Sequence, residues 1–151
     1  MALRFTRLDE IYEGYSIGFI TACTHSRQAL LNNESIHTAF RTFCERARAR
    51  KVFVGRYVLM PDHVHFFVTL PVECDLSTWM KSVKNSLSKV WREAGHPAPH
   101  WQKTFFDHIV RSATSYEEKW HYVRQNPVRA GLVQSAEKWP FQGEMNSVLF
   151  E

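Results

Sequence analysis

Two histidines separated by a single residue lie within an apolar stretch of the chain. His63 and His65 belong to residues 57–68, where most other side chains are apolar. Residues two apart in a β-strand point to the same face, so both imidazoles are expected on one face and Val64 and Phe66 on the other. Such a strand could carry part of a metal site, because imidazole is a common metal ligand. A His-x-His pair by itself is more often explained by two packed core histidines, so the rest of the chain has to decide.

A tyrosine and an asparagine form a second pair far along the chain. Tyr122 and Asn126 are four residues apart near the end of a predicted helix, which places them on one helical face. A tyrosine can act as a nucleophile toward a phosphate, but a phenol is protonated at neutral pH and needs a metal, a base or a polarised phosphate. A divalent cation held by two neutral imidazoles and an amide oxygen would keep most of its charge for that task. Taken alone, Tyr122 is explained by helix packing and Asn126 by helix termination.

The elements that must hold these residues follow from apolar spacing and turn signals. The pattern predicts strands at residues 14–23, 52–59, 64–70 and 101–112, and helices that begin at Glu34, near 75–77 and near 114–115. Asp75 or Ser77 is expected to cap the second helix, and Thr114 or Ser115 the third. The third helix is expected to end near residue 125, because a residue that precedes proline avoids the α region.

The order of these elements predicts the fold class. Only residues 60–63 separate the second and third strands, so an antiparallel hairpin is expected there. The whole order is strand, helix, strand, strand, helix, strand, helix. It predicts an α+β fold, a ferredoxin-like split βαβ sandwich with an antiparallel sheet, helices on one face and an added C-terminal helix. This fold serves many functions, so it does not identify one.

Composition narrows the class of protein further. With 151 residues, 44% of them hydrophobic and 23% charged, the chain is expected to form a single domain over residues 1–151. A net charge of +4 mildly favours a polyanionic partner such as nucleic acid. Three cysteines without a Cys-x-x-Cys spacing favour a reduced, cytoplasmic protein. Charged side chains among the first ten residues argue against a signal peptide, and no stretch is long and apolar enough to span a membrane.

Two motifs, taken in this order, resemble a known family. Residues 60–65 are Met-Pro-Asp-His-Val-His, and residues 122–131 are Tyr-Val-Arg-Gln-Asn-Pro-Val-Arg-Ala-Gly. Together they resemble the single-tyrosine HUH transposases, enzymes of bacterial insertion sequences that act on single-stranded DNA. The second motif and residues 101–108 resemble most the branch of REP-associated tyrosine transposases. The resemblance covers residues 14–133 and leaves residues 134–151 as a C-terminal tail.

The resemblance implies a role for each motif. His63, His65 and Asn126 would bind a divalent metal, magnesium or manganese rather than zinc. Tyr122 would attack a DNA phosphate and leave a 5′-phosphotyrosine link and a free 3′-hydroxyl. The implied activity is that of a transposase-like endonuclease and strand transferase, a DNA nickase and ligase that acts on hairpin-containing single-stranded DNA at palindromic repeats. The implied protein is nucleoid-associated in a bacterial cytoplasm, has no membrane partner, and is a monomer or a homodimer.

Other residues and other functions stay open from the sequence. Basic side chains near these motifs are candidates for DNA-phosphate contacts, although each singly is as well explained by a solvated charge. They are Lys81, Lys84, Lys103, Arg111 and Arg129. A non-catalytic protein derived from a transposase could bind DNA hairpins, but it would need neither the histidines nor Tyr122. A zinc-dependent hydrolase could use the two histidines, but no third His, Cys or carboxylate lies nearby at the spacing of a zinc site.

Overall fold

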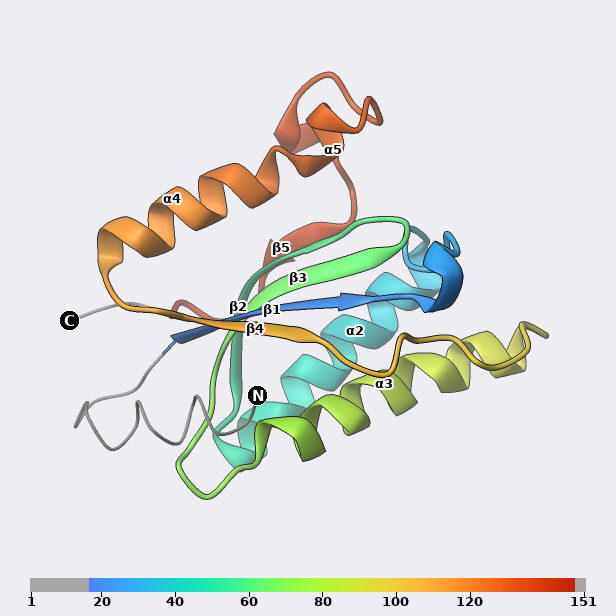
Figure 1. Ribbon diagram of the computed structural model, residues 1–151, viewed down its shortest axis with the longest axis horizontal. Coiled ribbons are helices and arrows are strands. Elements are labelled where there is room, and N and C mark those ends of the chain that lie inside the picture. Colours follow the sequence, from blue (N-terminus) through green and yellow to red (C-terminus); the bar gives the residue numbers. More distant parts are fainter. Residues whose placement is uncertain (1–16, 149–151) are drawn as a thin grey trace.

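A five-stranded antiparallel sheet forms the middle layer of the computed structural model, which describes residues 17–148 (Figure 1). The strands are β1 (Ile17–Cys23), β2 (Phe53–Leu59), β3 (His63–Thr69), β4 (Phe106–Val110) and β5 (Gln142–Glu144). The α-helices of this part are α2 (Glu34–Ala47), α3 (Leu76–Glu93), α4 (Ala113–Arg124) and α5 (Asn126–Arg129). The spatial order β4-β1-β3-β2-β5 contains the split βαβ arrangement in its first four strands.

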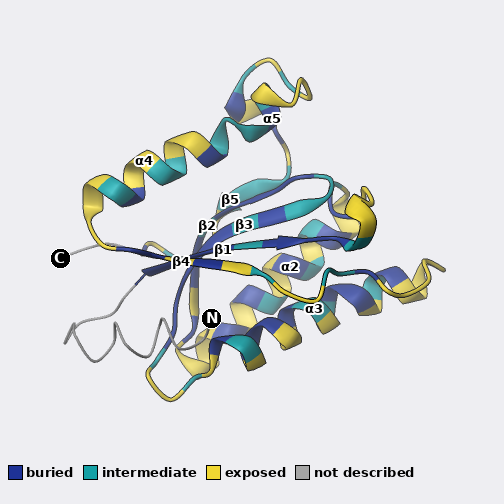
Figure 2. Ribbon diagram, in the orientation of Figure 1, coloured by how far each residue is buried: buried dark blue, intermediate teal, exposed yellow. Residues whose placement is uncertain are grey.

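Helices cover both faces of the sheet. Helices α2 and α3 lie side by side on one face, and α4 crosses the other (Figure 1). The larger core lies on the α2 and α3 side and includes Val64 and Phe66, whereas the smaller core lies under α4 and includes Phe19 and Phe67. Figure 2 shows buried residues facing both helical layers. Alternate residues of β3 therefore serve two different cores, and the predicted α+β sandwich with an added C-terminal helix is confirmed.

Helix starts are fixed by short polar side chains. One of the two predicted caps of α3 is confirmed, because the Asp75 carboxylate accepts a hydrogen bond from the Thr78 amide at 2.9 Å. The predicted cap of α4 at Thr114 or Ser115 is wrong. Ser112 has an extended backbone, and its hydroxyl accepts the Ser115 amide at 3.1 Å, so α4 begins already at residue 113.

The strand predicted at residues 101–112 is shorter than expected. It begins at Phe106, and Trp101 forms only an isolated bridge with β1's neighbour Thr24. The Trp101 indole donates to the Lys84 carbonyl at 3.1 Å, and the Lys84 ammonium donates to the Gln102 carbonyl at 2.9 Å. A lysine from α3 thus bonds a backbone carbonyl of residues 102–105, which do not form a strand.

Residues beyond 133 continue the fold, although the sequence motifs end there. The Trp139 indole donates to the Leu59 carbonyl at 3.0 Å, and β5 then pairs with the outer edge of β2. Gly143 lies opposite Tyr57 in this pair, and a Cβ at Gly143 would lie 2.9 Å from the Tyr57 hydroxyl oxygen. The glycine permits this close approach. The short polar run at residues 142–144 shows no strand alternation, so sequence pattern did not reveal β5.

Two further expectations concern the ends of elements and membranes. The first strand was expected from residue 14, and residues 14–16 lie outside the described part of the chain. Within residues 17–148, no helix has both the length and the apolar character needed to cross a bilayer.

Candidate active site

The two histidines of β3 lie on the face of the sheet that α4 covers. His63 pairs with Cys23, and His65 with Thr21, across to β1, and the two imidazole centroids are 4.7 Å apart. Phe67, the next residue on this face, packs against Tyr116 of α4 at a centroid distance of 4.4 Å. Strand alternation thus places the histidines as predicted, on the face opposite Val64 and Phe66.

Each histidine is held through its Nδ1 atom. His63 Nδ1 donates to the Asp62 carboxylate at 2.8 Å, and the other oxygen of Asp62 accepts from Arg27 Nε at 2.8 Å. A hydrogen bond of 2.8 Å joins His65 Nδ1 and the Thr21 hydroxyl. Within residues 17–148 neither Nε2 atom has a hydrogen-bond partner in the structure. Fixed Nδ1 contacts orient the rings and leave Nε2 as the atom able to bind a ligand.

Burial lowers the pKa of both rings and so favours their neutral form. Burial lowers the pKa of His65 to about 3, and the positive charges of Lys119 and Arg129 act in the same direction. Burial also lowers the pKa of His63, although the hydrogen bond to Asp62 opposes this change. Burial would raise the pKa of Asp62, but hydrogen bonds from Arg27 and His63 bring it below its usual value. A neutral imidazole next to a carboxylate is the form that binds metals.

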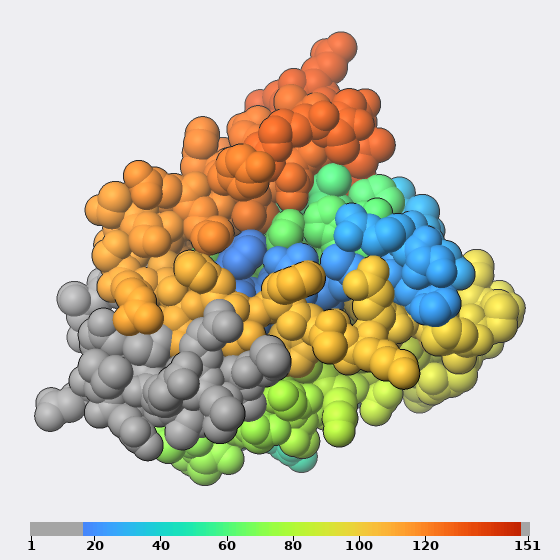
Figure 3. All heavy atoms as spheres, viewed as in Figure 1, coloured from blue at the N-terminus to red at the C-terminus, as the bar shows by residue number. Residues whose placement is uncertain are grey.

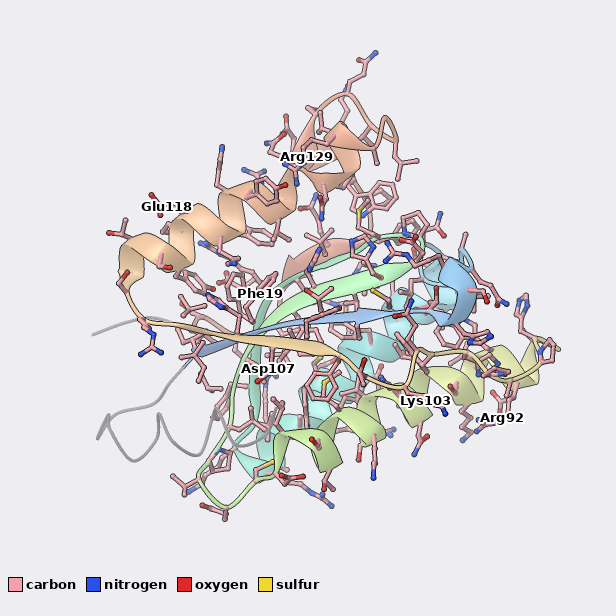
Figure 4. All side chains as sticks on the ribbon, viewed as in Figure 1. Phe19, Arg92, Lys103, Asp107, Glu118 and Arg129 are labelled. Atoms are coloured by element: carbon pink, nitrogen blue, oxygen red, sulfur yellow. The ribbon has the colours of Figure 1, made fainter. Side chains whose placement is uncertain are left out.

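Tyr122 and Asn126 form a compact cluster with Arg129 where α4 meets α5. The Arg129 guanidinium lies over the Tyr122 ring, 3.8 Å from its centroid. The same guanidinium donates to Asn126 Oδ1 at 2.6 Å. Tyr122 is 63% exposed, so its phenol is open to a large substrate. Figure 4 labels Arg129 at this junction, on the same side of the sheet as Phe19.

The proline after Asn126 shapes this cluster. Helix α4 ends at Arg124, as the sequence predicts, but α5 begins directly after one residue, with Asn126 first and Pro127 in its opening turn. Asn126 and Arg129 are therefore three apart within a helical turn, which explains why their side chains meet.

Helix α4 is fixed to the sheet by an arginine from β2. Arg56 forms ion pairs with Glu117 of α4 at 3.1 Å and with Glu144 of β5 at 3.6 Å. Its guanidinium also lies over the rings of Tyr116 and Trp120, at 5.5 and 5.6 Å from their centroids. These contacts hold the helix that carries Tyr122 on the face that carries the histidines.

A divalent metal fits the donor set. Two neutral Nε2 atoms from β3 face the α4 side, and the amide oxygen of Asn126 keeps a second lone pair beyond its bond with Arg129. In the described residues no group of three or more His, Cys, Asp and Glu side chains gathers as a metal site. The zinc-hydrolase alternative therefore gains no support, because structural and catalytic zinc sites draw on at least three such ligands.

The predicted DNA-binding residues are spread over the molecule. Arg129 belongs to the Tyr122 cluster, and Lys103 and Arg111 are exposed beside β4, as Figure 4 shows for Lys103. Lys81 is exposed on α3, on the other side of the sheet from the histidines. Lys84 is partly buried, and burial lowers its pKa where it meets the Gln102 carbonyl. Contact of these side chains with DNA stays a prediction.

Sequence pattern alone did not reveal the residues that support the histidines. Asp62 is adjacent to His63, and this adjacency was the available signal. Thr21 and Arg27 come from another part of the chain. The sheet register brings Thr21 to His65, and the 3-10 turn that follows β1 brings Arg27 to Asp62. Arg27 has a φ of 54°, a left-handed conformation rare for residues with a side chain.

Comparison with known proteins places the chain in a family. The family model described as "Transposase IS200 like" matches residues 16–126, which is most of the chain and ends at Asn126. The chain belongs to the IS200-like transposase family. Within this family, it is 26% identical over 130 residues to a REP-associated tyrosine transposase of Escherichia coli K12, with 82% of this chain and 73% of the relative covered. The predicted resemblance to the REP-associated branch is confirmed.

Three further comparisons give similar proteins or folds. A putative REP-associated tyrosine transposase of Haemophilus influenzae is 26% identical over 119 residues, covering 69% of this chain and 64% of the relative. The solved structure of a REP-associated tyrosine transposase bound to a REP hairpin matches with a TM-score of 0.69 and 26% identity, over 84% of this chain and 75% of that chain. A putative transposase from Deinococcus radiodurans R1 shares the fold, with a TM-score of 0.55, 15% identity, and coverage of 76% of this chain and 93% of that one.

Proposed function

We propose that the protein is a metal-dependent endonuclease and strand transferase that acts on hairpin-containing single-stranded DNA through Tyr122. The observation that carries this proposal is that His63 and His65 lie on the same face of the sheet as the helix that carries Tyr122. Tyr122 lies on α4, the helix that packs on the sheet face carrying the two histidines, and the charge of Arg129 beside Tyr122 acts on His65. A relative's structure bound to a REP hairpin supports hairpin DNA of palindromic repeats as the substrate.

The proposed reaction exchanges one phosphodiester for another. The phenolic oxygen of Tyr122 attacks the scissile phosphorus, and the bond from phosphorus to the 3′ oxygen breaks. The proton lost by the phenol ends on the departing 3′ oxygen, so the products are a 5′-phosphotyrosine and a free 3′-hydroxyl. Because one phosphodiester replaces another, the reverse reaction can rejoin an end.

The chain's own side chains assist in three ways. The Arg129 guanidinium over the Tyr122 ring favours negative charge on the phenol oxygen as it develops. His63, His65 and Asn126 would hold magnesium or manganese. When bound, such an ion would polarise the phosphate and orient it for attack. Asp62 and Thr21 keep the two imidazoles aimed at that position.

A covalent adduct tests the proposal. Labelled hairpin DNA with a single-stranded extension, incubated with manganese, should yield a protein–DNA species that survives denaturation. Tyr122→Phe should abolish it, whereas Tyr116→Phe, the same change at a buried tyrosine of the same helix, should retain it. Adduct formation by Tyr122→Phe would show that another residue is the nucleophile. Tight hairpin binding by the wild type without any adduct would support instead the non-catalytic binding protein.

A further inference from the structure

Phe106 is the most exposed large apolar side chain in the described part of the chain. It is 69% exposed, slightly more than Tyr122 at 63%. It lies at the start of β4, which is an edge strand of the sheet. A single exposed apolar side chain is common on protein surfaces, so the argument rests on where Phe106 lies relative to the histidines.

The sheet register aligns Phe106 with a histidine. Phe106 pairs with Thr21 across β4 and β1, and Thr21 pairs with His65 across β1 and β3. Directly paired residues of antiparallel strands lie on the same face. Phe106 therefore lies in one row with Thr21 and His65, at two strand spacings, about 10 Å, from the histidine. Asp107 points to the opposite face (Figure 4).

Positive side chains from α4 and α5 lie near the His65 end of the row formed by Phe106, Thr21 and His65. Lys119 of α4 lies over the Phe19 ring, with its ammonium 5.1 Å from the centroid, and both Lys119 and Arg129 act on His65. Figure 3 shows atoms of β1 and β3 at the surface between α4 and the segment of β4. A phosphate chain that crosses the histidine row would thus have cations from α4 and α5 on one side and the Phe106 ring on the other.

We propose that Phe106 is a stacking platform for an unpaired base next to the scissile phosphate. This inference rests on the proposed function, because it assumes that single-stranded DNA passes over His65. Every base has a π-face, so an exposed aromatic ring binds an unpaired base with little sequence preference. A base held at Phe106 would fix the neighbouring phosphate over the histidines, whereas a paired base inside a hairpin stem cannot stack there.

Binding measurements without a divalent metal test this inference separately from cleavage. One probe is a hairpin with a single-stranded extension that carries 2-aminopurine beside the cleavage position, and the other is the same hairpin without the extension. Phe106→Thr removes the ring but keeps a residue suited to strands. It should weaken binding of the extended hairpin on the order of tenfold and abolish quenching of the 2-aminopurine. Binding of the bare hairpin should not change, and Phe106→Trp should restore both signals.

Phe53→Thr serves as the matched control. Phe53 is 37% exposed on β2 and pairs with Thr69 of β3, at the end of the β2–β3 strand pair that is far from His63. Phe53→Thr should bind both probes like the wild type. Equal affinity of Phe106→Thr and the wild type for the extended hairpin would overturn the inference. An equal loss on both probes, or a change in self-association seen by sedimentation without a change in DNA affinity, would overturn it too.

The two proposals can fail independently. If Phe106→Thr loses the extension-dependent affinity but the wild type forms no covalent adduct, stacking stands and cleavage is wrong. If the adduct forms and requires Tyr122 while Phe106→Thr binds the extension normally, cleavage stands and stacking is wrong.

Discussion

Replacing Arg129 by alanine should slow adduct formation without unfolding the protein. Arg129 makes two contacts at once, a ring contact at 3.8 Å with Tyr122 and a hydrogen bond of 2.6 Å with Asn126. An exposed cation–π contact contributes about 0.5–1 kcal/mol, and a hydrogen bond with a charged donor contributes about 1.5 kcal/mol at the low end suited to an exposed site. If both act on the orientation of the proposed nucleophile, about 2–2.5 kcal/mol is lost, which corresponds to roughly thirtyfold to seventyfold in rate.

Lysine at this position separates charge from geometry. Arg129→Lys keeps the positive charge, but an ammonium cannot lie flat on the ring and bind the amide together as a guanidinium does. Its rate should fall between those of the wild type and Arg129→Ala. The rate of adduct formation is measured in a single turnover at saturating hairpin DNA with manganese, so that a difference in DNA affinity does not change it.

Arg92→Ala is the matched control for charge. Arg92 is exposed in the last turn of α3, on the other side of the sheet (Figure 4). The reasoning is refuted if Arg129→Ala and Arg92→Ala differ by less than twofold in rate. If Arg129→Ala instead lowers only DNA affinity and reduces the salt dependence by about one phosphate contact, Arg129 is a DNA-binding residue, as its sequence position first indicated, and not a positioning residue.

Three further changes probe the supports of the site and the fold. Asp62→Asn should weaken manganese binding in the presence of hairpin DNA by roughly tenfold or more, because it loosens the His63 ring; calorimetry showing unchanged affinity would contradict this. The folded pKa of His65, about 3, lies below its ordinary 6.5, so its share of the unfolding free energy is complete above pH 6.5 and lost as the pH falls toward 3. Urea unfolding without metal should show this slope, and His65→Gln should reduce it. Gly143→Ala should cost about 1–3 kcal/mol of stability, because its Cβ would press on the Tyr57 hydroxyl. Tyr57→Phe in the same chain should relieve part of this cost, and fully additive losses would speak against the clash.

Strand periodicity predicted one half of the site well. The alternation around His63 and His65 correctly predicted which face they share and which face packs against the larger core. It works because side-chain direction in a strand depends only on the neighbours along the chain. The same reasoning could not find Thr21 as the partner of His65, because the register between two strands is set by the whole sheet.

The conformational effect of Pro127 predicted the part of the site around Tyr122 and Asn126 only incompletely. The break before Pro127 was expected, but the immediate return to a helical turn was not. That turn brings Arg129 onto both Tyr122 and Asn126. The sequence placed Arg129 among the candidates for phosphate binding, because a basic residue near a nucleophile offers no sign of which partner it will choose. Lys84 shows the same limit, since its backbone carbonyl partner comes from a segment expected to be a strand.

The chain order around α4 and α5 has a mechanical consequence. These helices leave from β4, one edge of the sheet, and the chain rejoins the sheet at β5, the opposite edge. The segment that carries Tyr122 is therefore joined to the sheet at both edges. Arg56 adds a third attachment through its ion pairs with Glu117 and Glu144. Pairing of β5 with β2 therefore restricts how far the segment that carries Tyr122 can move from its own sheet. The placement of Tyr122, the proposed nucleophile, thus depends in part on the three residues of β5 at the opposite edge of the sheet, which lie outside both sequence motifs.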